Sequence, residues 1–136
     1  GKTLAEWLSE ARRWEADDAS ADLSARLRAA VAVAEALQEF HEVGVVYDNL
    51  SPSNIVLDVF EGSCVATLID LSEATIFYQK NEEFARKVGE TDLRRLGSIL
   101  LQLFRGYNGE DNDEDKYEPT GDEEAPNSRS IHDERK

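Results

Sequence analysis

The chain has 136 residues, in which 29 acidic side chains outnumber 15 lysines and arginines and give a formal net charge of −14. This length fits one small domain, and such an acidic chain repels a polyphosphate, so we expect no nucleic-acid partner. The single cysteine, Cys64, excludes an intrachain disulfide and a cysteine-rich zinc site. No apolar run approaches the roughly 20 residues that span a bilayer, and no signal-peptide pattern opens the chain. We therefore expect an intracellular protein, cytoplasmic or nuclear, that does not contact a membrane.

The negative charge is unevenly distributed along the chain. Residues 107–136 contain 11 acidic and 4 basic side chains, and residues 1–106 contain 18 and 11, so each part carries a net charge of −7. The same charge over 30 rather than 106 positions makes the last part much more acidic per residue. Because it also has few apolar residues to bury, residues 107–136 are predicted to be a disordered acidic tail. The folded domain is predicted over residues 1–106.

Two helices are predicted in the first third of the chain. Residues 1–19 place apolar side chains at steps of three and four, the pattern of an amphipathic helix. Residues 20–43 form the clearest helical pattern, and Gly44 follows where a helix tends to stop. We expect one broad apolar face on this second helix, made by Leu23, Leu27, Ala30, Val31, Ala34, Leu37 and His41.

The pattern changes after Gly44. Val45 and Val46 form a short β-prone step, and residues 47–54 are rich in turn formers. Residues 55–57 and 65–69 are apolar and flank a polar Glu61-Gly62-Ser63 turn, which predicts a β-hairpin. Residues 73–90 are predicted to be irregular, and residues 91–105 are predicted to be helical. The expected fold is therefore mainly α with a small β-hairpin.

Several motifs between residues 41 and 97 occur together in a recognisable order. The series Tyr47-Asp48-Asn49-Leu50 is followed by Asn54 five residues after Asn49, and by Asp70-Leu71-Ser72 after a further 16 residues. This order resembles the catalytic loop H-R-D-L-x-x-x-x-N and the D-F-G motif of the eukaryotic-type protein kinases. Residues 92–97 also resemble the start of the helix that anchors the large lobe in that family. The resemblance covers roughly residues 1–106.

The resemblance implies a partial protein-kinase-like large lobe and a set of site residues. In the family, the positions of Asn54 and Asp70 supply oxygen ligands to Mg²⁺, which holds the phosphates of ATP. Val56 would lie under the nucleotide base, and Asp92 would hold the backbone of the catalytic loop by hydrogen bonds. The implied cofactors are therefore ATP and Mg²⁺.

The departures from the family pattern indicate that phosphate transfer is weak or lost. Asn49 stands at the position of the catalytic aspartate, and an amide cannot act as a general base near neutral pH. Asp48, one residue earlier, could replace that base only after a local change of register. Only 21 residues separate Asp70 from Asp92, and the chain contains no glycine-rich phosphate loop and no lysine-bearing strand of the kinase small lobe. The favoured interpretation is a pseudokinase that acts as a regulatory or scaffold module.

Two alternative functions stay open at this point. The first is the large lobe of an active ATP-dependent serine/threonine protein kinase whose small lobe lies upstream. The second is a non-enzymatic helical adaptor with an acidic tail, which is preferred if residues 45–72 do not form a loop plus hairpin. In the kinase-like interpretation, an incomplete lobe exposes apolar surface, so another protein is expected to cover it.

Overall fold

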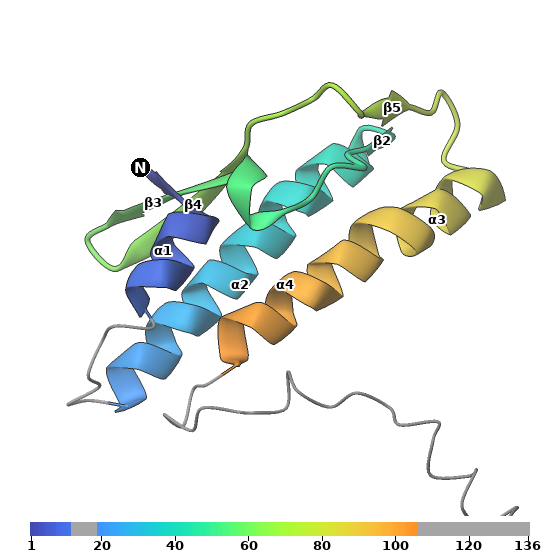
Figure 1. The fold of residues 1–136 in the computed structure, drawn as a ribbon. Helices are drawn as coiled ribbons and strands as arrows, with labels where there is room; N and C mark the ends of the chain where they lie inside the picture. Colours follow the sequence, from blue (N-terminus) through green and yellow to red (C-terminus); the bar gives the residue numbers. More distant parts are fainter. Residues whose placement is uncertain (12–18, 106–136) are drawn as a thin grey trace, which may run out of the picture.

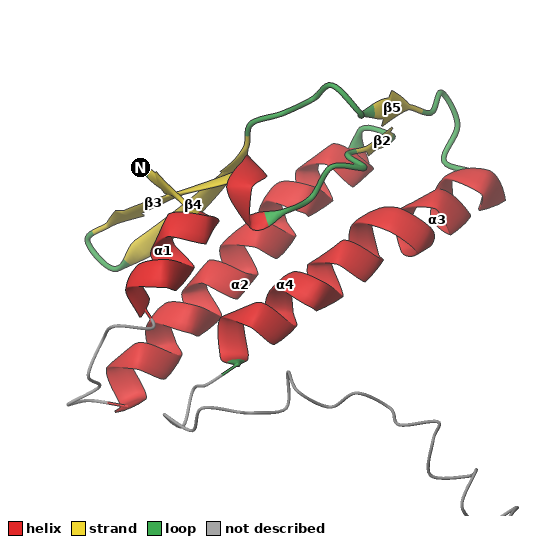
Figure 2. Ribbon diagram, viewed as in Figure 1, coloured by secondary structure: helices red, strands yellow, loops and turns green. Residues whose placement is uncertain are grey.

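The structure is a computed structural model that describes residues 1–11 and 19–105 (Figures 1 and 2). The fold is mixed α/β, with helices predominating over two small antiparallel sheets. The predicted acidic tail, residues 107–136, and the second half of the first predicted helix lie outside the described residues. The elements in chain order are β1 (Lys2–Thr3), α1 (Leu4–Ala11), α2 (Ala19–Glu42), β2 (Val45–Val46), the 3-10 turn η1 (Pro52–Asn54), β3 (Ile55–Phe60), β4 (Ser63–Leu68), β5 (Thr75–Ile76), α3 (Glu82–Val88), the π-helical turn η2 (Gly89–Leu93) and α4 (Arg94–Phe104).

Helix α2 forms the axis around which the other elements are arranged. It contacts β4 on one side and α4 on the other, and the short sheet β2–β5 lies beside its C-terminal end (Figure 1). Helix α1 packs against β3 and η1. None of the helices in the described parts of the chain is both long and apolar enough to cross a membrane.

The buried face of α2 differs from the predicted one. Leu37 is buried as expected, but Leu27 and Val31 are about half exposed, at 49 % and 55 %. The core is instead reached by a neighbouring stripe of the same helix, at Ala29, Val33 and Leu37. Alanine and valine occur on almost every side of α2, so periodicity alone could not decide which stripe faces the core. The members of the core from the other elements are Leu4, Trp7, Ala11, Tyr47, Leu50, Ile55, Leu57, Leu68, Ile99 and Leu103.

The predicted β-hairpin is confirmed, and it is longer than expected. Strands β3 and β4 pair in antiparallel register from Ile55 opposite Leu68 to Phe60 opposite Ser63. The two residues between them, Glu61 and Gly62, have φ angles of 49° and 81°. Two positive φ angles define the turn type that matches the right-handed twist of paired strands. Strand β1 adds a third strand along β3, which the sequence pattern did not predict.

Gly44 fixes the second sheet next to the end of α2. Its φ angle is +79°, and a Cβ atom at this position would lie 2.5 Å from the carbonyl oxygen of Phe77. The Gly44 carbonyl also accepts a hydrogen bond from the Phe77 N–H at 2.7 Å. Only glycine combines this backbone conformation with so close an approach. The β2–β5 pairing that follows brings the segment after β4 back to α2.

Residues 73–90 are more ordered than predicted, because they contain β5 and α3. Helix α3 begins at an N-cap, where the Asn81 side chain accepts a hydrogen bond from the Phe84 N–H. Acidic side chains at Glu82 and Glu83 and basic ones at Arg86 and Lys87 also suit the helix dipole. The helix then continues through η2 into α4, so the helix predicted over 91–105 is the second part of a longer helical segment.

One buried arginine joins the start of α2 to the end of α4. Arg26 is only 6 % exposed, and its Nε atom lies 3.0 and 3.1 Å from the two carboxylate oxygens of Asp22. Its Nη1 atom donates a hydrogen bond to the carbonyl oxygen of Leu103. A cation at the C-terminal end of a helix also complements the helix dipole. Arg26 is not part of the apolar face that the sequence predicts for this helix.

We predict that Arg26→Met destabilises the fold by about 3 kcal/mol, because Asp22 and the Leu103 carbonyl both lose a buried partner. Urea denaturation of the variant and of the parent chain measures this difference. Arg28→Met is the matched control, since Arg28 is an exposed arginine on the same helix, and we expect it to change stability by less than about 0.5 kcal/mol. An equal loss in the two variants would contradict the assigned role of Arg26.

Candidate functional site

A buried aspartate organises the loop that follows β2. Asp92, in η2, is fully buried. Its Oδ2 atom accepts a hydrogen bond from the Tyr47 N–H at 2.9 Å, and its Oδ1 atom accepts one from the Asp48 N–H at 2.7 Å. The Nε2 atom of His41, at the end of α2, lies 2.7 Å from the same Oδ2 atom. Asp92 therefore holds the loop backbone by hydrogen bonds, as expected, and ties it to α2 as well.

The position of Asp92 depends on the π-helical turn in which it lies. Such turns insert one extra residue into a helix and change the direction of the side chains around them, often at functional sites. The loop that Asp92 holds contains a strained residue, because Asp48 has a φ angle of 55°, a region that non-glycine residues rarely adopt. The hydrogen bond from the Asp48 N–H to Asp92 stabilises this conformation.

Backbone and side-chain interactions connect Asn49, Asn54 and Asp70, and all three are predicted site residues. The Nδ2 atom of Asn54 donates a hydrogen bond to the carbonyl oxygen of Asn49 at 2.8 Å. The carbonyl oxygen of Asn54 accepts a hydrogen bond from the Ile69 N–H at 3.0 Å, which joins η1 to the end of β4. The next residue, Asp70, interacts with the Asn49 side chain through its carboxylate. We call Asn49, Asn54 and Asp70 the polar cluster.

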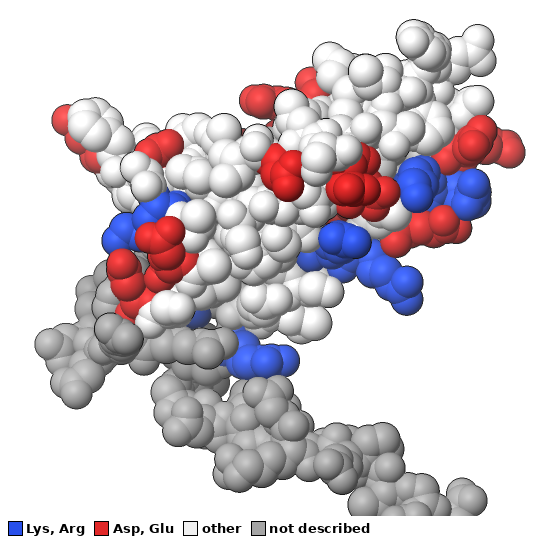
Figure 3. Space-filling model, turned by 45° about the horizontal axis from the view of Figure 1, so that its top comes forward, with Lys and Arg blue, Asp and Glu red and all other residues white. Residues whose placement is uncertain are grey.

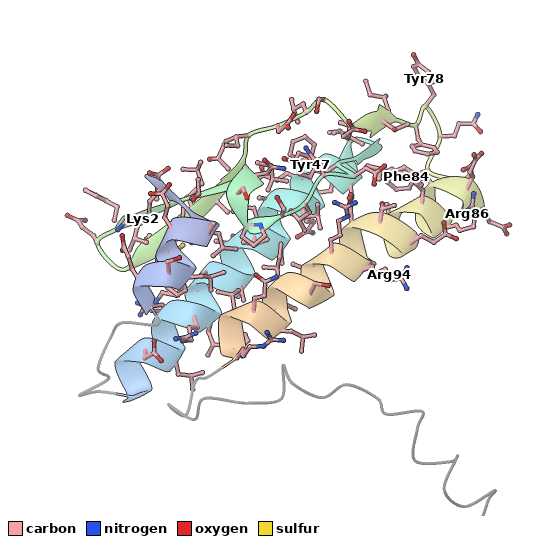
Figure 4. All side chains as sticks on the ribbon, viewed as in Figure 1. Lys2, Tyr47, Tyr78, Phe84, Arg86 and Arg94 are labelled. Atoms are coloured by element: carbon pink, nitrogen blue, oxygen red, sulfur yellow. The ribbon has the colours of Figure 1, made fainter. Side chains whose placement is uncertain are left out.

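Tyr47 lies beneath the polar cluster and connects it to the core. Its side chain is fully buried, and its ring centroid lies 5.6 Å from that of Phe40. Figure 4 shows Tyr47 between α2 and the segment that connects β4 with β5. Its hydroxyl oxygen accepts a hydrogen bond from the Asp70 N–H at 3.2 Å. Burial raises the pKa of Tyr47, and the nearby charges of Asp70 and Asp92 raise it further, so the hydroxyl is neutral.

Hydrogen bonds keep the Asp70 carboxylate ionised. The backbone N–H of Ser72 donates to the Oδ1 atom of Asp70 at 3.0 Å. This bond, the Ser72 side chain and the Asn49 side chain hold the pKa of Asp70 below its ordinary value of 3.8. The half-buried carboxylate therefore presents a negative charge throughout the neutral pH range.

The polar cluster leaves oxygen atoms available for a ligand. Because the Nδ2 atom of Asn54 is used by the Asn49 carbonyl, its amide oxygen is the atom left to interact elsewhere. The Asp70 carboxylate likewise has more lone pairs than its hydrogen bonds to Ser72 and Asn49 use. Within residues 1–11 and 19–105, no three His, Cys, Asp or Glu side chains are grouped to hold a metal ion.

The two other predicted site residues lie apart from the polar cluster. The Asp48 carboxylate lies 3.7 Å from the Nζ atom of Lys87 in α3, with which it forms a half-buried ion pair. Val56 lies in β3, where it pairs with Thr67 of β4 and Thr3 of β1. Its half-buried side chain lies beside Gly1, so the first residues of the chain border this position.

The sequence patterns did not indicate that Lys87 pairs with Asp48 or that the Tyr47 hydroxyl group contacts Asp70. Lys87 is 39 residues from Asp48, and no local pattern indicates that they meet. Tyr47 was noted only because the resembling motif has a histidine there. A tyrosine before a polar turn gives one weak signal, because a buried tyrosine hydroxyl requires a hydrogen-bond partner. His41, predicted as part of the apolar face of the helix, contacts Asp92 and packs edge-on against Phe84.

Comparison with protein-family models, with curated proteins and with solved structures found no match to this chain.

We predict that Asp92→Asn destabilises the fold by about 2–4 kcal/mol, because one amide oxygen cannot replace two carboxylate oxygens that accept three hydrogen bonds. Hydrogen exchange should become faster at the amides of Tyr47 and Asp48 in particular. Glu90→Gln, which neutralises an exposed carboxylate in the same turn, is the control and should leave these two amides unchanged. Unchanged protection of the two amides in Asp92→Asn would show that Asp92 does not hold the loop.

We predict that Ser72→Ala raises the pKa of Asp70 toward its ordinary value without restoring it fully, because the Ser72 backbone N–H still donates. Since the folded pKa is lowered, the stability from ionised Asp70 is fully present above pH 3.8 and is lost as the pH falls through the folded value. In Ser72→Ala this loss should be smaller and should be complete at a higher pH, because only the folded pKa changes. Carboxyl-carbon NMR titration of Asp70 measures the change, and an identical titration in both chains would contradict it.

Proposed function

We propose that this chain is a protein-kinase-like module that binds a magnesium-bound nucleotide through Asn54 and Asp70, and whose own phosphate transfer is weak or absent. The observation that carries the proposal is the polar cluster itself, which combines an amide oxygen and an ionised carboxylate with an amide at the position of the expected base. The role of such a module is regulation or scaffolding of a partner protein.

The donor set of the polar cluster suits Mg²⁺. This ion takes oxygen ligands, and in proteins it commonly uses one or two side chains while phosphates and waters complete its octahedron. Asn54 and Asp70 offer two side chains of this kind, an amide oxygen and an ionised carboxylate. When bound, Mg²⁺ would neutralise phosphate charge. Asn54 would orient its amide oxygen through the bond to the Asn49 carbonyl, and Asp70 would supply the negative charge.

The surroundings of Asn49 and Asp48 favour binding over transfer. Asn49 is the member of the polar cluster at the position of the expected base, and its amide cannot accept a proton from a hydroxyl group at neutral pH. Asp48 carries a carboxylate, but it is paired with Lys87 and its backbone is held by Asp92. A change of register that brought Asp48 into the cluster would break both contacts. These observations argue against the alternative of an active serine/threonine kinase.

The adaptor alternative depends on residues 45–72 not forming a loop plus hairpin. They do form both, with β2 and η1 in the loop region and β3 paired with β4. A simple helical adaptor also gives no reason for a buried aspartate to order a loop that carries three converging polar side chains. We therefore do not favour this alternative.

Exposed apolar side chains near the polar cluster support a protein partner. Ile69 and Leu71, on either side of Asp70, are 53 % and 56 % exposed. Val59 and Phe60, at the opposite end of the hairpin, are 64 % and 73 % exposed and belong to a different part of the surface. Exposed apolar side chains commonly mark interaction sites, and a partner that covers Ile69 and Leu71 would also shield the bound nucleotide from water.

We predict that MgCl₂ with a non-hydrolysable ATP analogue raises the melting temperature of the chain by several degrees. A ligand at 100 times its dissociation constant stabilises a protein by about 2.7 kcal/mol, which corresponds to roughly 10 °C for a domain of about 100 residues, and a lower ligand excess gives a smaller shift. Asn54→Ala and Asp70→Ala should remove the shift, because each deletes one oxygen ligand. Differential scanning fluorimetry with and without the ligand measures it.

The control variant is Glu61→Gln, which removes an exposed carboxylate at the hairpin turn and should keep the full shift. Identical melting curves with and without the ligand would contradict nucleotide binding. Phosphate transfer is assayed separately with radiolabelled ATP and a general protein substrate. Transfer that Asp48→Ala abolishes would contradict the proposed loss of activity and restore the active-kinase alternative.

A further inference from the structure

Helix α4 exposes a face that the fold does not use. Ile99 and Leu103 are buried against the rest of the molecule, whereas Leu93 and Leu101 are 51 % and 71 % exposed. Successive residues of an α-helix are separated by about 100°, so positions 94 and 101 lie almost above one another, opposite the buried side. Arg94 and Arg95 are exposed as well. We call Leu93, Arg94, Arg95 and Leu101 the α4 face.

The two arginines of the α4 face have no counter-ion among residues 1–11 and 19–105. Within the part of the chain that the structure describes, Arg94 and Arg95 form no ion pair, whereas Arg86 and Lys87 of α3 are paired with Glu90 and Asp48. Figure 4 shows Arg94 directed away from α2, and Figure 3 shows Lys and Arg side chains on the α3 and α4 side of the surface. An unpaired pair of arginines beside exposed leucines suits an acidic partner segment that also carries apolar side chains.

The α4 face is an exception in an otherwise acidic protein. Residues 94–105 contain three arginines and no acidic side chain, while residues 1–106 as a whole carry a net charge of −7. A strongly acidic segment is therefore repelled by the domain in general and attracted to this helix. The charge pattern selects one place for such a segment to bind.

The chain itself contains a segment of the required kind. Residues 110–124 hold nine acidic side chains and one basic one, together with Tyr117. They follow the end of α4 after five residues, which span up to about 17 Å when extended. Helix α4 has 11 residues and is about 16 Å long, so residues 110–124 can reach any point along it. A tethered segment also has an effective concentration in the millimolar range, which a free acidic protein does not match.

We propose that residues 110–124 dock on the α4 face of the same chain, with their carboxylates paired with Arg94 and Arg95 and Tyr117 packed near Leu93 and Leu101. The contact covers the exposed leucines and neutralises the two arginines. Because most of its charges are exposed, it weakens as salt is added. This inference is independent of nucleotide binding, since none of its residues belongs to the polar cluster.

The test uses the full chain with a nitroxide attached to a cysteine introduced by Thr120→Cys, a position that leaves the charges of residues 110–124 unchanged. Cys64→Ser removes the native thiol. We expect the nitroxide to broaden the amide resonances of Arg94–Phe104 at low ionic strength and to broaden them much less in about 0.5 M NaCl, where the Debye length is roughly 4 Å. Resonances of β3 and β4 provide the internal reference.

Two variants and one mixing experiment distinguish the outcomes. The double variant Arg94→Glu with Arg95→Glu should remove the broadening, whereas Arg28→Glu, on the exposed side of α2, should retain it. Unchanged core resonances verify that each variant is folded. Broadening that survives the double reversal, or no broadening in the parent chain, would overturn the proposal. Broadening of ¹⁵N-labelled chains by added nitroxide-labelled ¹⁴N chains would also overturn it, because the acidic segment would then bind a second copy.

Discussion

The buried carboxylate of Asp92 is the constraint on which the rest of the structure depends. It connects the end of α2, the loop after β2 and the helical segment that leads into α4, through contacts with His41, Tyr47 and Asp48. A buried charge without partners is costly, so the three donors must stay in place for the carboxylate to stay buried. The loop therefore has one conformation, including the strained backbone of Asp48, and Tyr47 is oriented to hold Asp70 from below.

Arg26 makes a second buried polar contact, at the opposite end of the α2–α4 helix pair. Arg26 and Asp92 are the two buried polar residues of the described chain. Arg26 joins the start of α2 to the end of α4, and Asp92 joins the start of α4 to the end of α2. Apolar packing between two helices allows sliding and rotation, whereas directional contacts at both ends fix their register. The α2–α4 pair is thus a rigid support, and the polar cluster is built on the loop that it holds.

Local sequence patterns predict much of the fold, but they predict only part of the candidate site. The helix of residues 20–43 and the hairpin around Gly62 were predictable because periodicity and turn chemistry act over a few residues. Helix α3 also had a local signal, an asparagine cap at Asn81 with acidic residues after it, although its short length hid it within a polar segment. The proximity of Asn54 and Asp70 was expected from motif spacing. The pairing of Asp48 with Lys87 and the burial of Arg26 depend on tertiary contacts, which no local pattern encodes.

Asn49 lies next to the carboxylate of Asp70, and the type of side chain at position 49 affects the pKa of that carboxylate. The hydrogen bonds from Ser72 are the main cause of the lowered pKa of Asp70, and the Asn49 side chain lowers it further, whereas a carboxylate at position 49 would repel Asp70 and raise its pKa. In the proposed kinase-like interpretation, the asparagine at the position of the general base therefore also favours the ionised form of the proposed cation ligand. Phosphate transfer would need a side chain at position 49 that accepts a proton. Cation binding by Asp70 instead benefits from a hydrogen-bond donor at position 49. An asparagine meets the demand of binding alone, which is why the polar cluster supports a nucleotide-holding module better than an active transferase.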